Sequence, residues 1–248
     1  HISAVLNITP DHLDRHKTVE NYTRIKEKIF SNQDENDFTV LNYDDPATRN
    51  MALRTKAKVF FFSSGHKINE GIYIDNGNIM LKRHGKDRFI LNVKELKILG
   101  THNYENVMAS VAIALCAGID IDSIIEVVKK FPGVEHRIEF VRSVDGVDYY
   151  NDSKGTNCDA AVRGILAMVK PCVLIGGGYD KGAEYDEWVE KFSGRVKHLV
   201  LVGATKDKIA ECCLKHGFNN FTKADTFEEA VVLSKNIAES GECVLLSP

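Results

Sequence analysis

The features that this sequence lacks already exclude several classes of protein. No apolar run approaches the roughly 18 to 20 residues that a membrane-spanning helix needs, and no block of like charges occurs. The 32 basic and 35 acidic residues leave a net charge of −3. We therefore expect neither a nucleic-acid-binding surface nor a membrane-binding surface. With 248 residues, 44% of them hydrophobic, the chain can form one large or two modest packed domains.

The residue spacings that define several common sites are also missing. None of the six cysteines forms a CxxC pair, and most of them stand in apolar, periodic stretches. We expect reduced thiols in a cytosolic protein and no zinc site. The dinucleotide fingerprint G-x-G-x-x-G is absent, which argues against a Rossmann dehydrogenase. The P-loop pattern Gly-x-x-Gly-Lys-[Ser/Thr] is absent as well.

Both ends of the chain show strand patterns that are already under way. Residues 1–7 read His-Ile-Ser-Ala-Val-Leu-Asn, without an initiator Met, and residues 243–248 read Cys-Val-Leu-Leu-Ser-Pro. Chain termini usually lie at the surface rather than inside core strands. The expectation is a chain cut at both ends.

Strands alternate with helices along the sequence, and this order predicts an α/β fold. Phe131-Pro132-Gly133 is the best internal break, because Pro and Gly both end a helix. We expect one domain at residues 1–132 and a doubly wound domain at residues 133–248. Asn76-Gly77 and Asp145-Gly146 each predict the turn of a hairpin. Helices are expected near residues 17–31, 102–117, 121–130, 157–168, 184–193, 205–216 and 226–239, and strands near 2–8, 37–43, 57–62, 72–74, 79–81, 138–150, 173–175, 198–202 and 243–246, with a further strand pair through 88–98.

A dense polar cluster follows the first strand. Residues 7–16 read Asn-Ile-Thr-Pro-Asp-His-Leu-Asp-Arg-His. Carboxylate and imidazole groups suit a divalent cation held beside phosphates, and the carboxyl end of a strand is where α/β folds place ligands. From the residues alone, a solvated turn in which Asp11 caps the next helix explains the cluster as well.

Two further polar segments lie at the start of an expected helix and at the proposed boundary between domains. Residues 100–106 read Gly-Thr-His-Asn-Tyr-Glu-Asn and open a helix of small residues. Amide side chains both donate and accept, so they can read bases and sugars, although helix capping explains them equally. Residues 131–137 read Phe-Pro-Gly-Val-Glu-His-Arg and lie on the proposed hinge. Without further information, Arg137 is an ordinary surface charge.

The last two segments lie in the second expected domain. Residues 150–157 read Tyr-Asn-Asp-Ser-Lys-Gly-Thr-Asn, where Thr156 or Asn157 could simply cap a helix. Residues 176–182 read Gly-Gly-Gly-Tyr-Asp-Lys-Gly directly after a strand. Glycines let backbone amides approach an anion closely, but three glycines in a loop are a weak signal alone.

Taken in order, these five segments resemble the signatures of the Mur ligase family. The resemblance covers residues 7–182, and Asn-Asp-Ser-Lys-Gly-Thr-Asn at 151–157 is similar to the version in members that add D-glutamate. It implies the later part of a P-loop-type ATPase domain at residues 1–132, followed by a Rossmann-like amino-acid-binding domain at residues 133–248. The P-loop, an acidic magnesium ligand and a domain for the UDP group would precede this chain. Residues 1–248 alone are therefore expected to be inactive.

The resemblance also implies ligands for metal and nucleotide. His12 would bind Mg²⁺, and Lys26, on the next helix, would be carbamylated and bind the same ion, with Lys28 as the less favoured choice. Two Mg²⁺ ions and ATP are the expected cofactors. Contacts to ATP are implied for four residues: the amides Asn103 and Asn106 at the adenosine, Asp152 at the ribose, and Arg137 at the phosphates when the domains close.

The substrates that the resemblance implies are small molecules. Lys154 would contact a phosphate or the reaction intermediate, and His12, Lys26 and Lys154 are the expected catalytic residues. Thr156 and Lys181 would hold D-glutamate, which is joined to UDP-N-acetylmuramoyl-L-alanine through an acyl phosphate in peptidoglycan precursor synthesis. A monomer in the bacterial cytoplasm is expected.

Three alternatives stay open at this point. A sister ligase that adds another amino acid, or a folylpolyglutamate synthase-like ligase, would keep the His12 and Lys26 segments but should lack the 151–157 version. A non-catalytic nucleotide-binding relative would fit the missing P-loop. A dehydrogenase is disfavoured by its missing glycine fingerprint.

Overall fold

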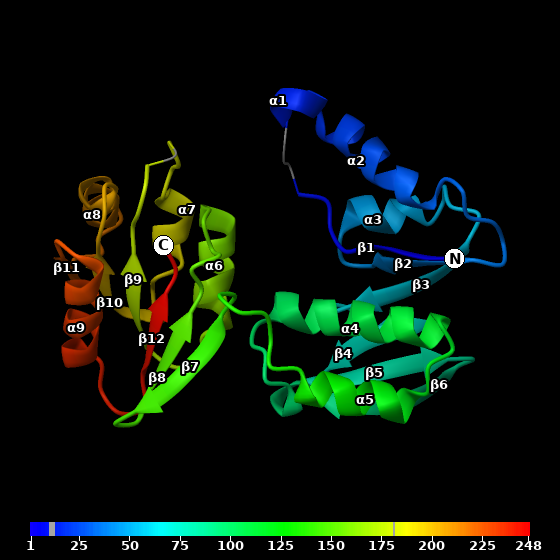
Figure 1. The fold of residues 1–248 in the computed structure, drawn as a ribbon. Coiled ribbons are helices and arrows are strands. Elements are labelled where there is room, and N and C mark those ends of the chain that lie inside the picture. The colour runs from blue at the N-terminus through cyan, green and yellow to red at the C-terminus, as the bar shows by residue number, and fades with distance from the viewer. Residues whose placement is uncertain (10–12, 181) are drawn as a thin grey trace. The chain divides into compact units, whose positions relative to one another are not determined.

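The computed structural model describes residues 1–9, 13–180 and 182–248, which form two compact units (Figure 1). Unit 1 comprises residues 1–97 and 101–131, and unit 2 comprises residues 98–100 and 132–248. Each unit is built on one mixed, mostly parallel six-stranded sheet with helices against it, which confirms the predicted α/β class. In the part of the chain that is described, no helix combines the length and apolarity needed to cross a membrane.

Unit 1 has the strand order β1-β2-β3-β4-β5-β6. Strands β1 to β4 are parallel, and β5 and β6 extend the sheet antiparallel. Helix α4 packs across β1 to β4 with one buried face. The elements are β1 (Ile2–Val5), α1 (Leu13–His16), α2 (Val19–Glu27), a 3-10 helix (Lys28–Phe30), β2 (Phe38–Asn42), α3 (Pro46–Met51), β3 (Lys58–Ser63), β4 (Gly71–Asp75), β5 (Asn78–Arg83), β6 (Lys86–Asn92), a 3-10 helix (Val93–Glu95), α4 (Thr101–Cys116) and α5 (Ile121–Lys130).

Unit 2 has the strand order β11-β10-β9-β12-β8-β7, in which only β7 is antiparallel to its neighbour. Alternate residues of the central strands point to opposite faces. Leu174 and Leu245 pack with α6, α7 and α8, whereas Val173 and Val244 pack with α9. The unit is therefore doubly wound. Its elements are β7 (Glu139–Val144), β8 (Val147–Asn151), α6 (Cys158–Ala167), β9 (Cys172–Gly176), α7 (Asp186–Glu190), β10 (Val196–Leu201), α8 (Lys206–Lys215), β11 (Phe221–Lys223), α9 (Phe227–Ile237) and β12 (Cys243–Leu246).

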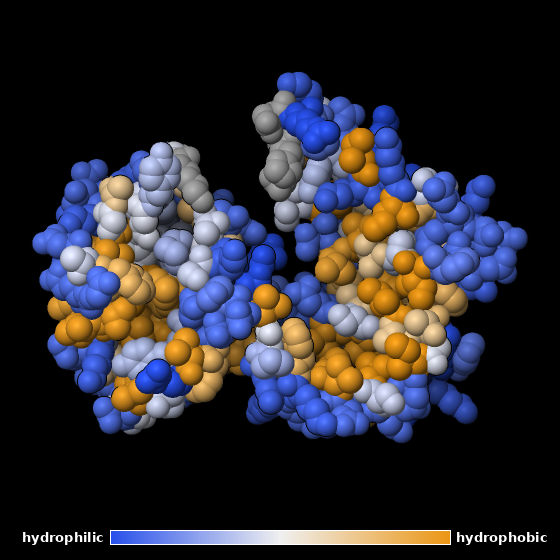
Figure 2. All heavy atoms as spheres, viewed as in Figure 1, coloured by the Kyte–Doolittle hydropathy of each residue, from blue (hydrophilic) through white to orange (hydrophobic). Residues whose placement is uncertain are grey.

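Both predicted hairpins are confirmed by their turn geometry. Asn76 and Gly77 have φ values of 49° and 79°, and Asp145 and Gly146 have 53° and 80°. Positive φ at both central residues is the signature of the two-residue turn that matches strand twist. On the face shown in Figure 2, hydrophilic side chains cover much of the outer rim of each unit.

Two local expectations were wrong. The strand pair expected through 88–98 is a single strand, β6, because Asn92 and Glu95 form a capping box that starts a 3-10 helix. The apolar stripe expected on the helix at 17–31 was also too wide. Ile25 and Ile29 are 45% and 56% exposed, and α2 has no buried residue, so Phe30 is the apolar side chain of this segment that enters the core. The short strand β11 was not anticipated at all.

Candidate functional site

At the carboxyl edge of the sheet in unit 1, Asp45 anchors the start of the 7–16 segment. Its Oδ2 accepts a hydrogen bond from the backbone N–H of Ile8 at 2.8 Å. Its Oδ1 accepts from the N–H of Thr48 at 2.9 Å, which caps α3. One carboxylate therefore ties the chain beyond β1 to the helix that follows β2. His12, the predicted magnesium ligand of this segment, lies outside the described residues.

Asp44 organises the neighbouring loop after β3. It accepts hydrogen bonds from Ser63 Oγ and His66 Nδ1 at 2.7 Å each, and from the N–H groups of Ser64 and Gly65. Burial alone would raise the pKa of Asp44, but these hydrogen bonds outweigh it and hold the pKa below its usual value. Every donor stabilises the ionised carboxylate, so Asp44 serves here as a loop anchor rather than as an acid.

The same loop contacts helix α4, which carries the two predicted nucleotide ligands. Ser64 Oγ donates to Glu105 Oε1 at 2.6 Å, so the first turns of α4 lie beside the carboxyl end of β3. Asn103 and Asn106 belong to these turns, and Asn106 is exposed. The structure thus brings both amides to the carboxyl edge of the sheet, where open α/β sheets bind ligands.

Lys26 lies on α2 and is exposed, with its Nζ 5.2 Å from the centre of the Tyr22 ring. An ammonium group over an aromatic face makes a cation–π contact. In this state the side chain is a cation and offers no lone pair to a metal. It could become a metal ligand only after losing its charge, and its exposure leaves the amine accessible for that change.

In unit 2, Asp152 is only 5% exposed and uses both carboxylate oxygens inside the protein. Oδ2 accepts from Ser247 Oγ at 3.0 Å, and Oδ1 accepts from the N–H of Ile138 at 3.2 Å. Burial raises the pKa of Asp152, although these hydrogen bonds and the nearby Arg137 charge oppose the shift. The side chain is therefore placed to hold neighbouring segments, and the ribose contact stays a prediction.

Arg137 itself stands between two residues in an unusual backbone conformation. His136 and Ile138 have φ values of 68° and 48°, and positive φ is a genuine strain for a β-branched residue such as Ile138. The hydrogen bond from Ile138 to Asp152 holds this conformation in place. The exposed Arg137 side chain is thus mounted on a strained segment, and such strain is concentrated at functional sites.

A pocket of about 260 Å³ opens beyond the carboxyl ends of the strands in unit 2. Two helices begin at it: α6, capped by Asn157, and α8, which follows Thr205. Helix N-termini carry partial positive charge and favour anionic groups. Among the predicted residues, Thr156 lines the pocket, Lys154 is exposed on the preceding loop, and Lys181 lies outside the described residues.

Trp188 lines this pocket and also carries a buried polar atom. The residue is 2% exposed, and its Nε1 has no hydrogen-bond partner among the described residues. A buried donor without a partner costs about 1–3 kcal/mol. Trp188 was not predicted as a site residue, although it is the one tryptophan of the chain and lies a few residues after the glycine loop.

The geometry of Asp152 gives a first prediction. Asp152→Ala leaves the Ile138 N–H and the Ser247 hydroxyl without their acceptor, so it should reduce the free energy of unfolding by about 2–4 kcal/mol. Asp152→Asn retains an oxygen for Ile138 and should cost less than about 1 kcal/mol. Urea denaturation of both variants measures the difference. Equal losses would show that the hydrogen bonds do not matter.

The pH dependence of stability provides a second readout for the same residue. Because burial raises the pKa of Asp152, the folded protein binds this proton more readily than the unfolded chain does. The wild type should therefore gain stability, relative to Asp152→Asn, as the pH falls through the folded pKa toward about 4. A difference that grows in the opposite direction would contradict this assignment.

Both units match known domain families. Residues 1–114 match the Mur ligase middle domain, and residues 136–248 match the Mur ligase, glutamate ligase domain. Among curated proteins, the UDP-N-acetylmuramoylalanine–D-glutamate ligase of Lachnospira eligens is 53% identical over 247 residues, and that of Thermoanaerobacter sp. strain X514 is 49% identical over 249. Each alignment covers 100% of this chain but 55% of the relative, so the chain spans about half the length of these relatives.

Solved structures show the same fold at low sequence identity. A MurF structure from Acinetobacter baumannii matches with a TM-score of 0.72 at 18% identity, covering 99% of this chain and 56% of that chain. A MurF ligase from Thermotoga maritima in complex with ADP matches with a TM-score of 0.70 at 17% identity, covering 99% and 57%.

Proposed function

This chain belongs to the Mur ligase family, and we propose that the full-length protein joins D-glutamate to UDP-N-acetylmuramoyl-L-alanine with ATP. The main support is the pocket in unit 2. It is lined by Thr156 and by the starts of two helices, and it lies beside the glycine loop. Relatives that are 47–53% identical bear the name of this D-glutamate ligase. The reaction would belong to peptidoglycan precursor synthesis in the bacterial cytoplasm, with the enzyme acting as a monomer.

The size and charge of the pocket support an amino acid as its ligand. Its volume of about 260 Å³ is below the roughly 300–1,000 Å³ of pockets for drug-sized molecules. The helix N-termini favour carboxylates, of which D-glutamate has two. We assign to Thr156 a contact with D-glutamate and to Lys181 an ion pair with one of its carboxylates.

The proposed chemistry divides one amide-forming reaction into two steps. The alanyl carboxylate attacks the γ-phosphorus of ATP, ADP leaves, and an acyl phosphate forms. The deprotonated amine of D-glutamate then attacks the acyl carbon, and phosphate leaves. Arg137 and Lys154 would offset negative charge during phosphoryl transfer, since guanidinium and ammonium groups both bind phosphates. Asn103 and Asn106 would hold the adenosine, and Asp152 would contact the ribose.

Magnesium would be held by His12 and a carbamylated Lys26 and would supply further charge compensation at the phosphates. Lys26 is the one described residue of this pair, and it fits the role of a metal ligand only when it is carbamylated. The exposed Lys26 amine is a cation, whereas a carbamate is an anionic oxygen ligand of the kind that Mg²⁺ prefers.

Isotope transfer would test the proposed acyl phosphate. With oxygen-18 in the alanyl carboxylate of the UDP substrate, the released phosphate should carry one labelled oxygen, because the attacking oxygen leaves with phosphorus. Mass spectrometry of the phosphate measures this. Phosphate without label would contradict the mechanism.

A further inference from the structure

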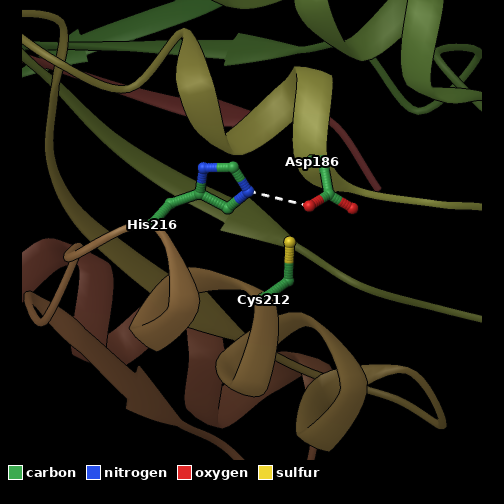
Figure 3. A group of neighbouring side chains, drawn as sticks. All are labelled: Asp186, Cys212 and His216. Atoms are coloured by element: carbon green, nitrogen blue, oxygen red, sulfur yellow. Dashed lines mark hydrogen bonds and ion pairs between the residues drawn. The ribbon is translucent and has the colours of Figure 1, made fainter.

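Three potential metal ligands meet between helices α7 and α8, apart from every residue assigned above. They are Asp186 at the start of α7, Cys212 in α8 and His216 at the end of α8. One ligand atom from each lies within 4.8 Å of the other two. In Figure 3 the imidazole and the thiol extend from α8 toward the Asp186 carboxylate, and His216 Nε2 lies 2.8 Å from Asp186 Oδ1.

The spacing on α8 is well suited to binding one ion. Cys212 and His216 are four residues apart, so they project from the same face of the helix one turn apart. Thiolate, imidazole and carboxylate are the three side-chain ligands that Zn²⁺ takes, and three protein ligands leave one position for water. No CxxC spacing marks the group, because the third ligand comes from a different helix.

A cation already lies against this cluster. Lys215 Nζ already lies 2.5 Å from Asp186 Oδ1. Lys215 Nζ and His216 Nε2 both hydrogen-bond to this oxygen. The end of α8 also presents the negative pole of the helix. A metal ion would replace both the Lys215 contact and the hydrogen bond between His216 and Asp186.

We propose that Asp186, Cys212 and His216 form a binding site for a thiophilic divalent metal ion, with Zn²⁺ as the favoured ion. The site joins α7 to α8, which also shape the pocket: Trp188 of α7 and Ile209 of α8 line its wall. Metal binding therefore clamps two walls of that pocket together. We expect it to raise the thermal unfolding temperature of the protein.

Titration with Co²⁺ tests this site directly, because a thiolate bound to cobalt absorbs in the near ultraviolet. The purified protein, stripped with a chelator and kept reduced, should develop this band on addition of Co²⁺, and Zn²⁺ should displace it. Cys212→Ser should abolish the band, and His216→Gln should weaken Co²⁺ binding about tenfold or more. Cys116→Ser, a half-buried cysteine of unit 1, is the matched control and should leave the band unchanged.

A gain-of-affinity variant keeps the test independent of folding defects. Lys215→Ala removes the competing cation and should bind Co²⁺ more tightly than the wild type. The proposal is overturned if the wild type shows no thiolate band, if the band persists in Cys212→Ser, or if Lys215→Ala binds no more tightly. None of these residues takes part in the proposed amide-forming reaction, so loss of metal binding and loss of ligase activity can be distinguished.

Discussion

Gly177→Ala should destabilise unit 2 by about 3 kcal/mol or more, a large effect for a single methyl group. Gly177 has a φ of 110°, and a Cβ there would lie 2.2 Å from the carbonyl oxygen of Val202. Both the backbone conformation and the contact with rigid main chain oppose a side chain. Urea denaturation followed by circular dichroism would measure the loss.

Gly178→Ala is the matched control for this experiment. Among the described residues, a Cβ at Gly178 meets only Pro248 Cβ, at 4.0 Å, and φ is not in the left-handed region. This neighbouring substitution should change stability by less than about 1 kcal/mol. Equal effects at the two positions would show that the geometry of the loop after β9 is not what requires Gly177.

Arg137→Ala should reduce kcat of the full-length enzyme about a thousandfold, the loss typical of an arginine that stabilises phosphoryl transfer. The structure presents this guanidinium on the strained segment between His136 and Ile138, held by Asp152. Arg137→Lys should restore only part of the activity, because an ammonium group cannot make two parallel hydrogen bonds to a phosphate. Steady-state kinetics with saturating substrates would measure kcat.

Arg142 provides the control for the loss of positive charge. It is an exposed arginine on β7 in the same unit, and the proposed function gives it no role. Arg142→Ala should retain kcat within about twofold, since exposed charges away from a site contribute little. A similar loss in both variants would assign the effect to general electrostatics, and an active Arg137→Ala would remove this residue from the mechanism.

Much of the fold was predictable because its signals are local. The turns at Asn76-Gly77 and Asp145-Gly146 depend on φ preferences of two adjacent residues, and the structure has both. The apolar strands of unit 2 appeared as short runs because both faces of its sheet are covered. Strand β11, with three residues, is too short to produce such a run.

The organisation of the site was harder to predict from the sequence, because it depends on contacts between segments that are distant along the chain. Asp45 bonds Ile8 across 37 residues, and Ser247 bonds Asp152 across 95. Two adjacent acids after a buried strand were the only available signal for Asp44 and Asp45. The roles of His12 and Lys181 came from the family resemblance and stay predictions, since both lie outside the described residues.

Amino-acid specificity is the most direct test of the proposed function. Phosphate release from ATP would be measured with the full-length protein, UDP-N-acetylmuramoyl-L-alanine, and D-glutamate, L-glutamate or other amino acids in turn. The account predicts release that requires D-glutamate and the UDP substrate together. Phosphate release that depends on a different amino acid, or no release with any amino acid, would contradict the assignment of this pocket to D-glutamate.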